Sequence, residues 1–333
     1  VVLAGRTAPP LNLSRYQVSG SVLTLEKDSL RFDLEEVRSF LSQQGIRLSK
    51  ERVFDLDRKT EGWPGALSLL TGSRQGILKE TCWKLSDVYE YLASEVFEHQ
   101  PEDIREFLVL TSILDEMTPE ICNLLLEIDN SQQIFNLLES QQLFLISLSG
   151  VKKAYRYHQL FREFLLERLG GRRSQAAHKA GKIFHEQGDI ELAVKYLIMA
   201  GIDSDTGRVL KEAALQAMHQ GRWLTVARWL EQINELEIAV NPWYSLFKAQ
   251  VEIYRGELDQ AEYWGIRAET GFNKEGNISG SLESKILLAR ILRCRGRYQQ
   301  SLALLNQVSQ RLPLAEFEIR FDVPLEIALC MTM

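Results

Sequence analysis

The sequence predicts a mainly α-helical chain that ends in an α-solenoid. Three observations support this fold class: apolar residues recur at helical spacing over most of the chain, helix-capping residues precede several of these segments, and one glycine pattern recurs four times in the second half. Strand-type sequence is confined to the first four residues and to two short segments between 143 and 157.

The recurring pattern begins at Gly188, Gly221, Gly256 and Gly296, which lie 33, 35 and 40 residues apart. Apolar or small residues follow each glycine at offsets +2, +5, +8, +9 and +12, which is one face of a helix. Each glycine stands where a preceding helix must end and reverse. The spacing fits a repeat of two helices.

The pattern resembles the second helix of a tetratricopeptide repeat, with small residues at offset +5 and often at +12. Pro313 falls where that family ends its unit. The first helices are expected at about 173–186, 206–219, 242–255 and 281–295, and a fifth unit is expected to begin around Pro324. We therefore expect 171–333 to form an incomplete repeat array; the alternative is a helical bundle with chance periodicity.

Composition narrows the classes of function. The 333 residues carry a formal charge of −6, which argues against a chain-wide surface for nucleic acid or an anionic membrane. No apolar run is long enough to span a bilayer, so we expect no membrane contact. The scattered cysteines read as core residues of a reduced protein, so we expect a cytoplasmic location. Four scattered cysteines and five histidines show no convincing metal-ligand spacing, so no metal is expected; only His178 and His185 share a helix face.

The first residues, Val1-Val2-Leu3-Ala4, read as a short strand with no sheet to join. We expect 1–32 to be the end of an α/β domain that lies upstream. The segment 33–100 reads as helical, with Asp33 as a helix cap and a second helix at about 49–60. In the motif that follows, Gly62 can end one helix and Pro64 can start the next, and local physics alone explains both residues.

The segment 101–170 has the element order of a winged helix. Helices are expected from 101 to 114, after a cap at Thr118 and after a cap at Ser131, followed by strands at 143–148 and 154–157 and a helix from Gln159. Although this fold often binds DNA, 115–150 contains no lysine or arginine and six acidic residues. Because phosphate contacts supply most non-specific affinity, we expect no direct DNA contact here.

Together these segments resemble one family, the large LuxR-type bacterial transcriptional regulators with a central signal-transduction ATPase, of the maltose-regulon-activator kind. No single motif decides the resemblance, but their joint order is highly specific. The motifs that carry it are residues 2–11, Leu30-Arg31-Phe32, Glu61-Gly62-Trp63-Pro64-Gly65-Ala66-Leu67, Tyr91-Leu92-Ala93, residues 102–108, Thr111-Ser112-Ile113-Leu114 and residues 155–161.

The resemblance implies a helical lid at 33–100, a winged helix and a superhelical sensor. It also implies a nucleotide site to which Arg6 contributes a phosphate sensor, Gly62, Trp63 and Pro64 contribute contacts to adenine and ribose, and His158 contacts the phosphate of ADP. For His158 the alternative is a solvent-side histidine at a helix start. Lys153 and Arg156 either add positive potential to this site or form a solvated hairpin edge.

The chain departs from the family in two respects. It contains no G-x-x-x-x-G-K-[ST] phosphate loop and no terminal helix-turn-helix, which the family would place upstream and downstream of this segment. We therefore expect no enzyme activity from the chain itself and ATP or ADP binding only together with an upstream domain. The expected partners are an inducer or regulatory protein on the repeats, and another copy in the active state. The alternative is a stand-alone repeat scaffold that binds a peptide or protein.

Overall fold

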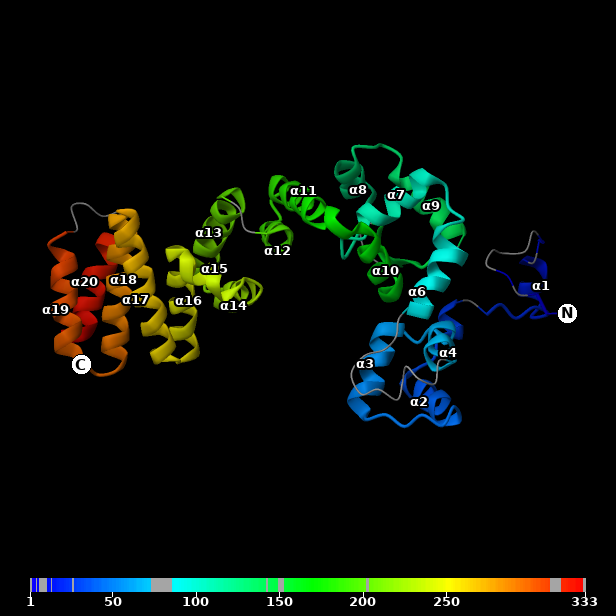
Figure 1. Cartoon of the computed structure of the whole chain (residues 1–333), viewed down its shortest axis with the longest axis horizontal. Helices are drawn as coiled ribbons and strands as arrows, with labels where there is room; N and C mark the ends of the chain where they lie inside the picture. Colours follow the sequence, from blue (N-terminus) through cyan, green and yellow to red (C-terminus); the bar gives the residue numbers. More distant parts are fainter. Residues whose placement is uncertain are drawn as a thin grey trace. The chain divides into compact units, whose positions relative to one another are not determined.

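The computed structural model describes residues 2–3, 5, 11–12, 14–25, 27–72, 86–141, 143–148, 153–201, 204–311 and 319–331. The chain divides into two compact units, residues 1–183 and 184–333, and each is described by itself (Figure 1). None of the described helices is long and apolar enough to cross a membrane.

The first unit begins with two short helical segments and continues with the helices of the predicted lid. The capping box predicted at Asp33 is confirmed, because its side chain accepts the amides of Glu35 and Glu36 while Glu36 accepts the Asp33 amide at 2.9 Å. The predicted second helix and the start at Pro64 are also confirmed. The elements are α1 (Ser14–Val18), η1 (Lys27–Leu30), α2 (Leu34–Gln43), α3 (Lys50–Thr60), α4 (Pro64–Gly72), α6 (Ser86–Leu92) and the π-helical turn η2 (Ala93–Phe97).

The predicted strand at the start of the chain is not seen in its described residues. Val2 and Leu3 have no regular secondary structure, and their side chains are 94% and 63% exposed. A strand is stable only when a neighbour pairs with its backbone, and no described residue of this chain provides that neighbour.

The winged-helix order is confirmed. The cap at Thr118 is present, since its hydroxyl accepts the Ile121 amide, but the cap predicted at Ser131 lies one residue earlier, at Asn130. Ser131 is instead the first helical residue, and its side chain is buried. The elements are α7 (Glu102–Thr111), α8 (Pro119–Leu126), α9 (Ser131–Ser140), β1 (Leu145–Leu148), β2 (Ala154–Tyr157), α10 (Gln159–Leu169) and η3 (Gly170–Arg172).

A small aromatic core holds the hairpin on the helices of this domain. The strands β1 and β2 pair antiparallel, with Leu145 opposite Tyr157. The Tyr155 ring stacks on Phe135 of α9 at 4.2 Å between centroids, and its backbone pairs with Met117 through an isolated bridge. The Tyr157 hydroxyl lies 2.7 Å from the Thr111 hydroxyl of α7. These contacts fix β2 and therefore the position of His158, which follows it directly.

The second unit is built from pairs of helices that turn at the predicted glycines. Gly188, Gly221, Gly256 and Gly296 have φ between +72° and +82°, and after each one the next amide bonds to a carbonyl five residues back at 2.8–2.9 Å. This is the Schellman closure of a helix end, which a residue without a Cβ adopts at no steric cost. The first helices are α11 (Arg173–Glu186), of which only residues 184–186 belong to this unit, α13 (Ser204–His219), α16 (Pro242–Arg255) and α18 (Ile278–Cys294).

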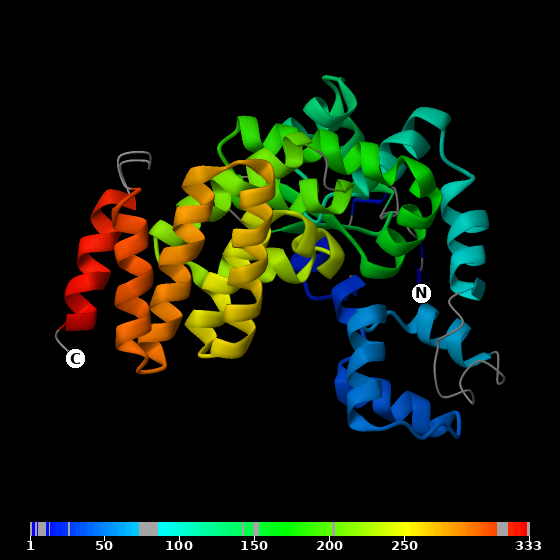
Figure 2. The same ribbon diagram turned by 60° about the vertical axis from the view of Figure 1, so that its left-hand side comes forward.

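The second helix of every pair begins two residues after the glycine. These helices are α12 (Ile190–Ala200), α14 (Trp223–Glu231), α17 (Leu258–Glu275) and α19 (Tyr298–Ser309). The residues at offset +5, namely Ala193, Val226, Ala261 and Ser301, are all at most 1% exposed. The predicted periodicity is therefore confirmed, and small side chains occupy the positions where helices approach most closely. Both views show the helices from α16 to α20 standing side by side (Figures 1 and 2).

Two features of the array were not predicted. A short helix, α15 (Glu235–Val240), is inserted between α14 and α16. Arginines near the glycines also pair with acidic residues on the second helix of the preceding pair. These ion pairs are Arg222 with Glu191, Arg255 with Glu231 at 2.6 Å, and Arg295 with both Asp259 and Glu262.

The last helix, α20 (Ile319–Met331), contains Pro324 in its interior, so the predicted helix start at this proline is wrong. Proline is tolerated best in the first turn of a helix, and Pro324 lies just beyond it, in the second turn. The helix packs on α18 and α19: Ile327 packs against the cluster of Leu282, Ile286 and Val308, and Cys330 forms a second cluster with Ala289 and Leu305. Pro313 lies outside the described residues.

Candidate functional site

The turn between α3 and α4 requires glycine at position 62. Glu61 and Gly62 have φ values of +47° and +67°, so two successive residues adopt the left-handed conformation. The Gly62 carbonyl accepts the Phe32 amide at 2.9 Å. A Cβ at Gly62 would lie 2.1 Å from the Phe32 carbonyl oxygen, closer than atoms can approach. The motif around Arg31 and Phe32 is thus held against the turn by backbone contacts.

Trp63 brings this turn into contact with the winged-helix domain. Its indole is half-buried and lies edge-on to Phe144 at 5.0 Å and to His158 at 6.0 Å, with Tyr91 of α6 at 6.1 Å. Edge-to-face contacts of this kind are favourable for aromatic rings. A Cβ at Gly65 would lie 2.8 Å from the indole nitrogen, so glycine leaves room for the ring.

His158 is buried, with 6% of its surface exposed, so the alternative of a solvent-side histidine is wrong. Its Nε2 donates to the Thr60 carbonyl at 3.0 Å. Its Nδ1 is buried without a hydrogen-bond partner. Burial lowers the pKa of His158 by more than the nearby Glu61 charge raises it. The neutral ring therefore has one unpaired acceptor, which is the feature that a ligand could satisfy.

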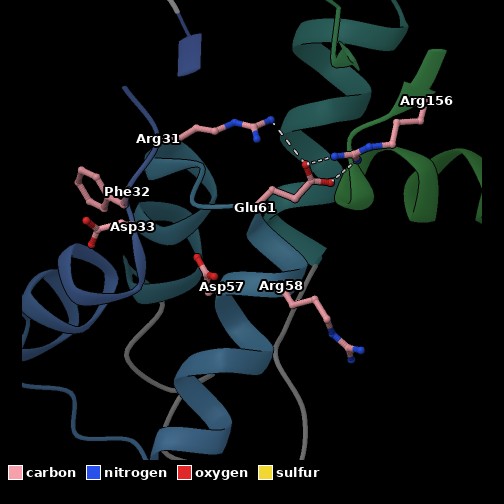
Figure 3. A pocket seen from close by; sticks show the side chains of 7 residues that line it. All are labelled: Arg31, Phe32, Asp33, Asp57, Arg58, Glu61 and Arg156. Atoms are coloured by element: carbon pink, nitrogen blue, oxygen red, sulfur yellow. Dashed lines mark hydrogen bonds and ion pairs between the residues drawn. The ribbon is translucent and has the colours of Figure 1, made fainter. Parts of the chain in front are cut away.

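The Glu61 carboxylate is the centre of the polar contacts (Figure 3). It accepts two hydrogen bonds from Arg156, at 2.8 and 3.1 Å, and one from the Gln159 amide at 2.9 Å, and Arg31 lies 3.5 Å away. Burial alone raises a carboxyl pKa, but these hydrogen bonds and positive charges together hold the pKa of Glu61 below its usual value. The same contact raises the pKa of Arg156.

An open pocket of about 530 Å³ lies beside these groups. Its charges are balanced, with three arginines and three carboxylates, and two of the arginines face Glu61 (Figure 3). Burial, with the neighbouring Asp33 charge, raises the pKa of Asp57. The lining residues are Arg31, Phe32, Asp33, Asp57, Arg58, Glu61 and Arg156.

Four of the five residues expected at a nucleotide site lie together: Gly62, Trp63 and Pro64 in the turn, and His158 against it. Arg6 lies outside the described residues. Lys153 does not join this group, because its ammonium binds Glu139 at 2.9 Å on the exposed hairpin. Among the described residues, no group of three or more potential ligands is placed to hold a metal ion.

Comparison with known proteins shows the same relationship. The family described as MalT winged helix domain matches residues 93–178. The HTH-type transcriptional regulator MalT of Vibrio campbellii is 24% identical over 322 residues, which are 93% of this chain and 34% of that protein. The chain is a homologue of the MalT regulators. The relationship suggested by the sequence motifs is therefore confirmed, and the chain spans about a third of the length of these MalT relatives.

Two further similarities extend beyond MalT. The serine/threonine-protein kinase PknK of Mycobacterium tuberculosis is 28% identical over 290 residues, which are 78% of this chain and 26% of that protein. A STAND protein with a tetratricopeptide repeat sensor from Pyrococcus horikoshii has a similar fold, with a TM-score of 0.56 and 17% identity over 90% of this chain and 44% of that one. The predicted fold class is thus confirmed. The predicted boundaries at 32, 100 and 170 stay predictions.

The pKa of His158 gives a testable pH dependence. The unfolded chain has a histidine pKa of about 6.5 and the folded chain a lower one, so the unfolded state binds more protons as the pH falls below 6.5. We expect the thermal midpoint to fall between pH 6.5 and 5 by more in the wild type than in His158→Gln, which keeps a donor for Thr60 but does not titrate. Above pH 5 Glu61 stays ionised, because its pKa is lowered from 4.5. Parallel curves for the two proteins would contradict this expectation.

Proposed function

We propose that the chain is the regulatory and sensor part of an ATP-dependent bacterial transcriptional activator. In this role it couples the nucleotide state to the binding of an inducer or a regulatory protein on the repeats. The observation that carries the proposal is the contact between the Gly62-Trp63-Pro64 turn and His158, in a chain homologous to MalT regulators. The similarity to a STAND protein with a tetratricopeptide repeat sensor supports the same arrangement of parts.

The residues present fit a nucleotide at this turn. Trp63 is half-buried and offers an aromatic surface, and His158 Nδ1 is a buried polar atom without a partner. A bound nucleotide would supply a purine and a negatively charged phosphate group, and the phosphate would pair with His158 Nδ1 when that nitrogen is protonated and donates to it. In the chain itself, Gly62 and Pro64 fix the turn that presents Trp63, while Phe144 and Thr60 hold the His158 ring in one orientation.

The proposed switch depends on residues that contact the nucleotide in one state of the protein but not in the other. A residue that contacts the nucleotide in only one state biases the equilibrium between states, whereas one that contacts it equally in both does not. His158 belongs to the winged helix and Trp63 to the lid, so we propose that His158 contacts only the ADP state and that Trp63 contacts both. We further propose that the winged helix itself makes no DNA contact, because α9 carries no basic residue.

The full-length protein provides the test. We expect His158→Ala to weaken ADP binding and raise basal transcription without inducer, and Trp63→Ala to lower the affinity for both nucleotides. The matched control is His99→Ala, which alters an exposed histidine. Nucleotide affinities from equilibrium binding and reporter expression are the readouts. Equal effects of His158→Ala on ADP and ATP, without a change in basal expression, would refute the proposal.

A further inference from the structure

Glu61 has a backbone conformation in which glycine or asparagine is usually found. It ends α3 with φ +47° and ψ +37°, in the left-handed region. A residue with a Cβ is destabilised there relative to glycine, and helices usually place glycine or asparagine at such a position. A strained residue persists where the surrounding contacts over-determine it. The side chain of Glu61 makes contacts that glycine could not replace.

The carboxylate joins its own turn to two other segments of the chain, residues 156–159 and Arg31. It holds the guanidinium of Arg156 on β2 with two bonds and the first amide of α10 with one, and Arg31 lies on its other side. The positive end of the α10 dipole adds to this attraction. The side chain of Glu61 is 14% exposed, so solvent screens these charges less than on the surface.

A second glutamate shows what the same backbone does without this role. Glu127 ends α8 with φ +59° and also forms one ion pair, with Lys179. Its side chain is 80% exposed, and both partners lie at the surface. Left-handed geometry and an ion pair thus also occur at the surface, where the Glu127 carboxylate makes a single contact that solvent can screen. Glu61 differs because its carboxylate is largely buried and its hydrogen-bond partners, Arg156 and the Gln159 amide, belong to the winged helix, while its backbone belongs to the lid.

We propose that Glu61 is a latch: its carboxylate holds the lid turn on the winged helix, and this bond must break before the two can separate. The use of that movement in signalling rests on the proposed function. The latch itself is a property of the chain without nucleotide. The neighbouring bond from His158 to the Thr60 carbonyl closes the same contact, so release of Glu61 exposes both the Gln159 amide and the His158 ring.

Hydrogen exchange of the full chain without nucleotide tests the latch. We expect Glu61→Gln to speed exchange about tenfold or more in peptides that contain Phe32, Trp63 and Gln159, because a hydrogen bond to a charged group is worth about 1.5–3 kcal/mol. Peptides from α8 should exchange as in the wild type. Glu127→Gln, which removes the same charge from the same backbone conformation, should change exchange at the lid turn by less than about twofold.

Two further variants separate a latch from general stabilisation. Glu61→Gly relieves the backbone strain but removes the carboxylate, so we expect fast local exchange with a smaller loss of thermal midpoint than in Glu61→Gln. Arg156→Gln added to Glu61→Gln should speed exchange no further, because the two side chains form one contact. Unchanged exchange in Glu61→Gln, wild-type exchange in Glu61→Gly, or a uniform increase over residues 1–183 would each overturn the latch. None of these outcomes depends on nucleotide binding, so they leave the proposed function to its own test.

Discussion

Gly62→Ala is expected to destabilise the first unit by about 3 kcal/mol or more, near the upper end for a single substitution. The new Cβ would meet the Phe32 carbonyl oxygen at 2.1 Å, and the backbone would still have to keep φ at +67°. Phe32 cannot withdraw without loss of the bond from its amide to the Gly62 carbonyl. Urea unfolding, followed by circular dichroism, measures the loss.

Gly45→Ala is the matched control. Gly45 has a similar φ of +75°, but nothing lies within 4 Å of its Cβ position. Only the conformational penalty then applies, and we expect a loss of about 1 kcal/mol. If both variants lose the same stability, the close approach of Phe32 to the turn is not important for the fold.

Glu326→Ala is expected to have the second large effect, confined to the end of the repeat array. Glu326 is 3% exposed and binds Arg290 at 2.6 Å and Arg293 at 3.0 Å, so its removal leaves two partly buried arginines on α18 without their anion. Breaking a buried ion pair typically costs about 3–5 kcal/mol. Repeat proteins open from their ends, so we expect this loss as faster hydrogen exchange in α20 and α19.

The control for this variant is Glu191→Ala, whose ion pair with Arg222 lies at the surface, with the Glu191 side chain 53% exposed. We expect it to change exchange in α12 by less than about fivefold, corresponding to under about 1 kcal/mol. If α20 exchanges at its wild-type rate in Glu326→Ala, the helix is held by Ile327 and Cys330 instead of the ion pairs.

Local signals in the sequence were sufficient to predict where many of the helices begin and end. Helix-capping and helix-starting residues act only on the few backbone groups next to them, so their effect can be predicted without knowledge of the fold. These residues are the repeat glycines, Asp33, Thr118 and Pro64. The pairing of Glu61 with Arg156 joins residues 95 positions apart, and no local pattern specifies it. In the sequence, Arg31 and Glu61 appeared only as members of the motifs that carry the family resemblance. The burial of His158 likewise depends on Trp63 and Phe144, which only tertiary packing brings to the ring.

The helix start expected at Pro324 was wrong for a related reason. A proline is compatible with the first turn of a helix but does not determine where that turn lies. In α20 the ion pairs of Glu326 and the packing of Ile327 and Cys330 favour a helix, and the helix extends upstream of the proline. Tertiary contacts therefore outweighed the local preference.

Each second helix begins two residues after its glycine, so the turns at the glycine end of the helix pairs have a constant length. The connections at the opposite end of the pairs vary in length. The glycine spacings of 33, 35 and 40 residues differ only because residues are added at the far ends of the helix pairs: α15 is inserted there, and α17 is 18 residues long against 11 for α12. The turns at the four glycines therefore keep one backbone geometry while the length of the units varies. For protein engineering, the loop between α17 and α18, near Gly276, is the place to insert an affinity tag or a reporter domain.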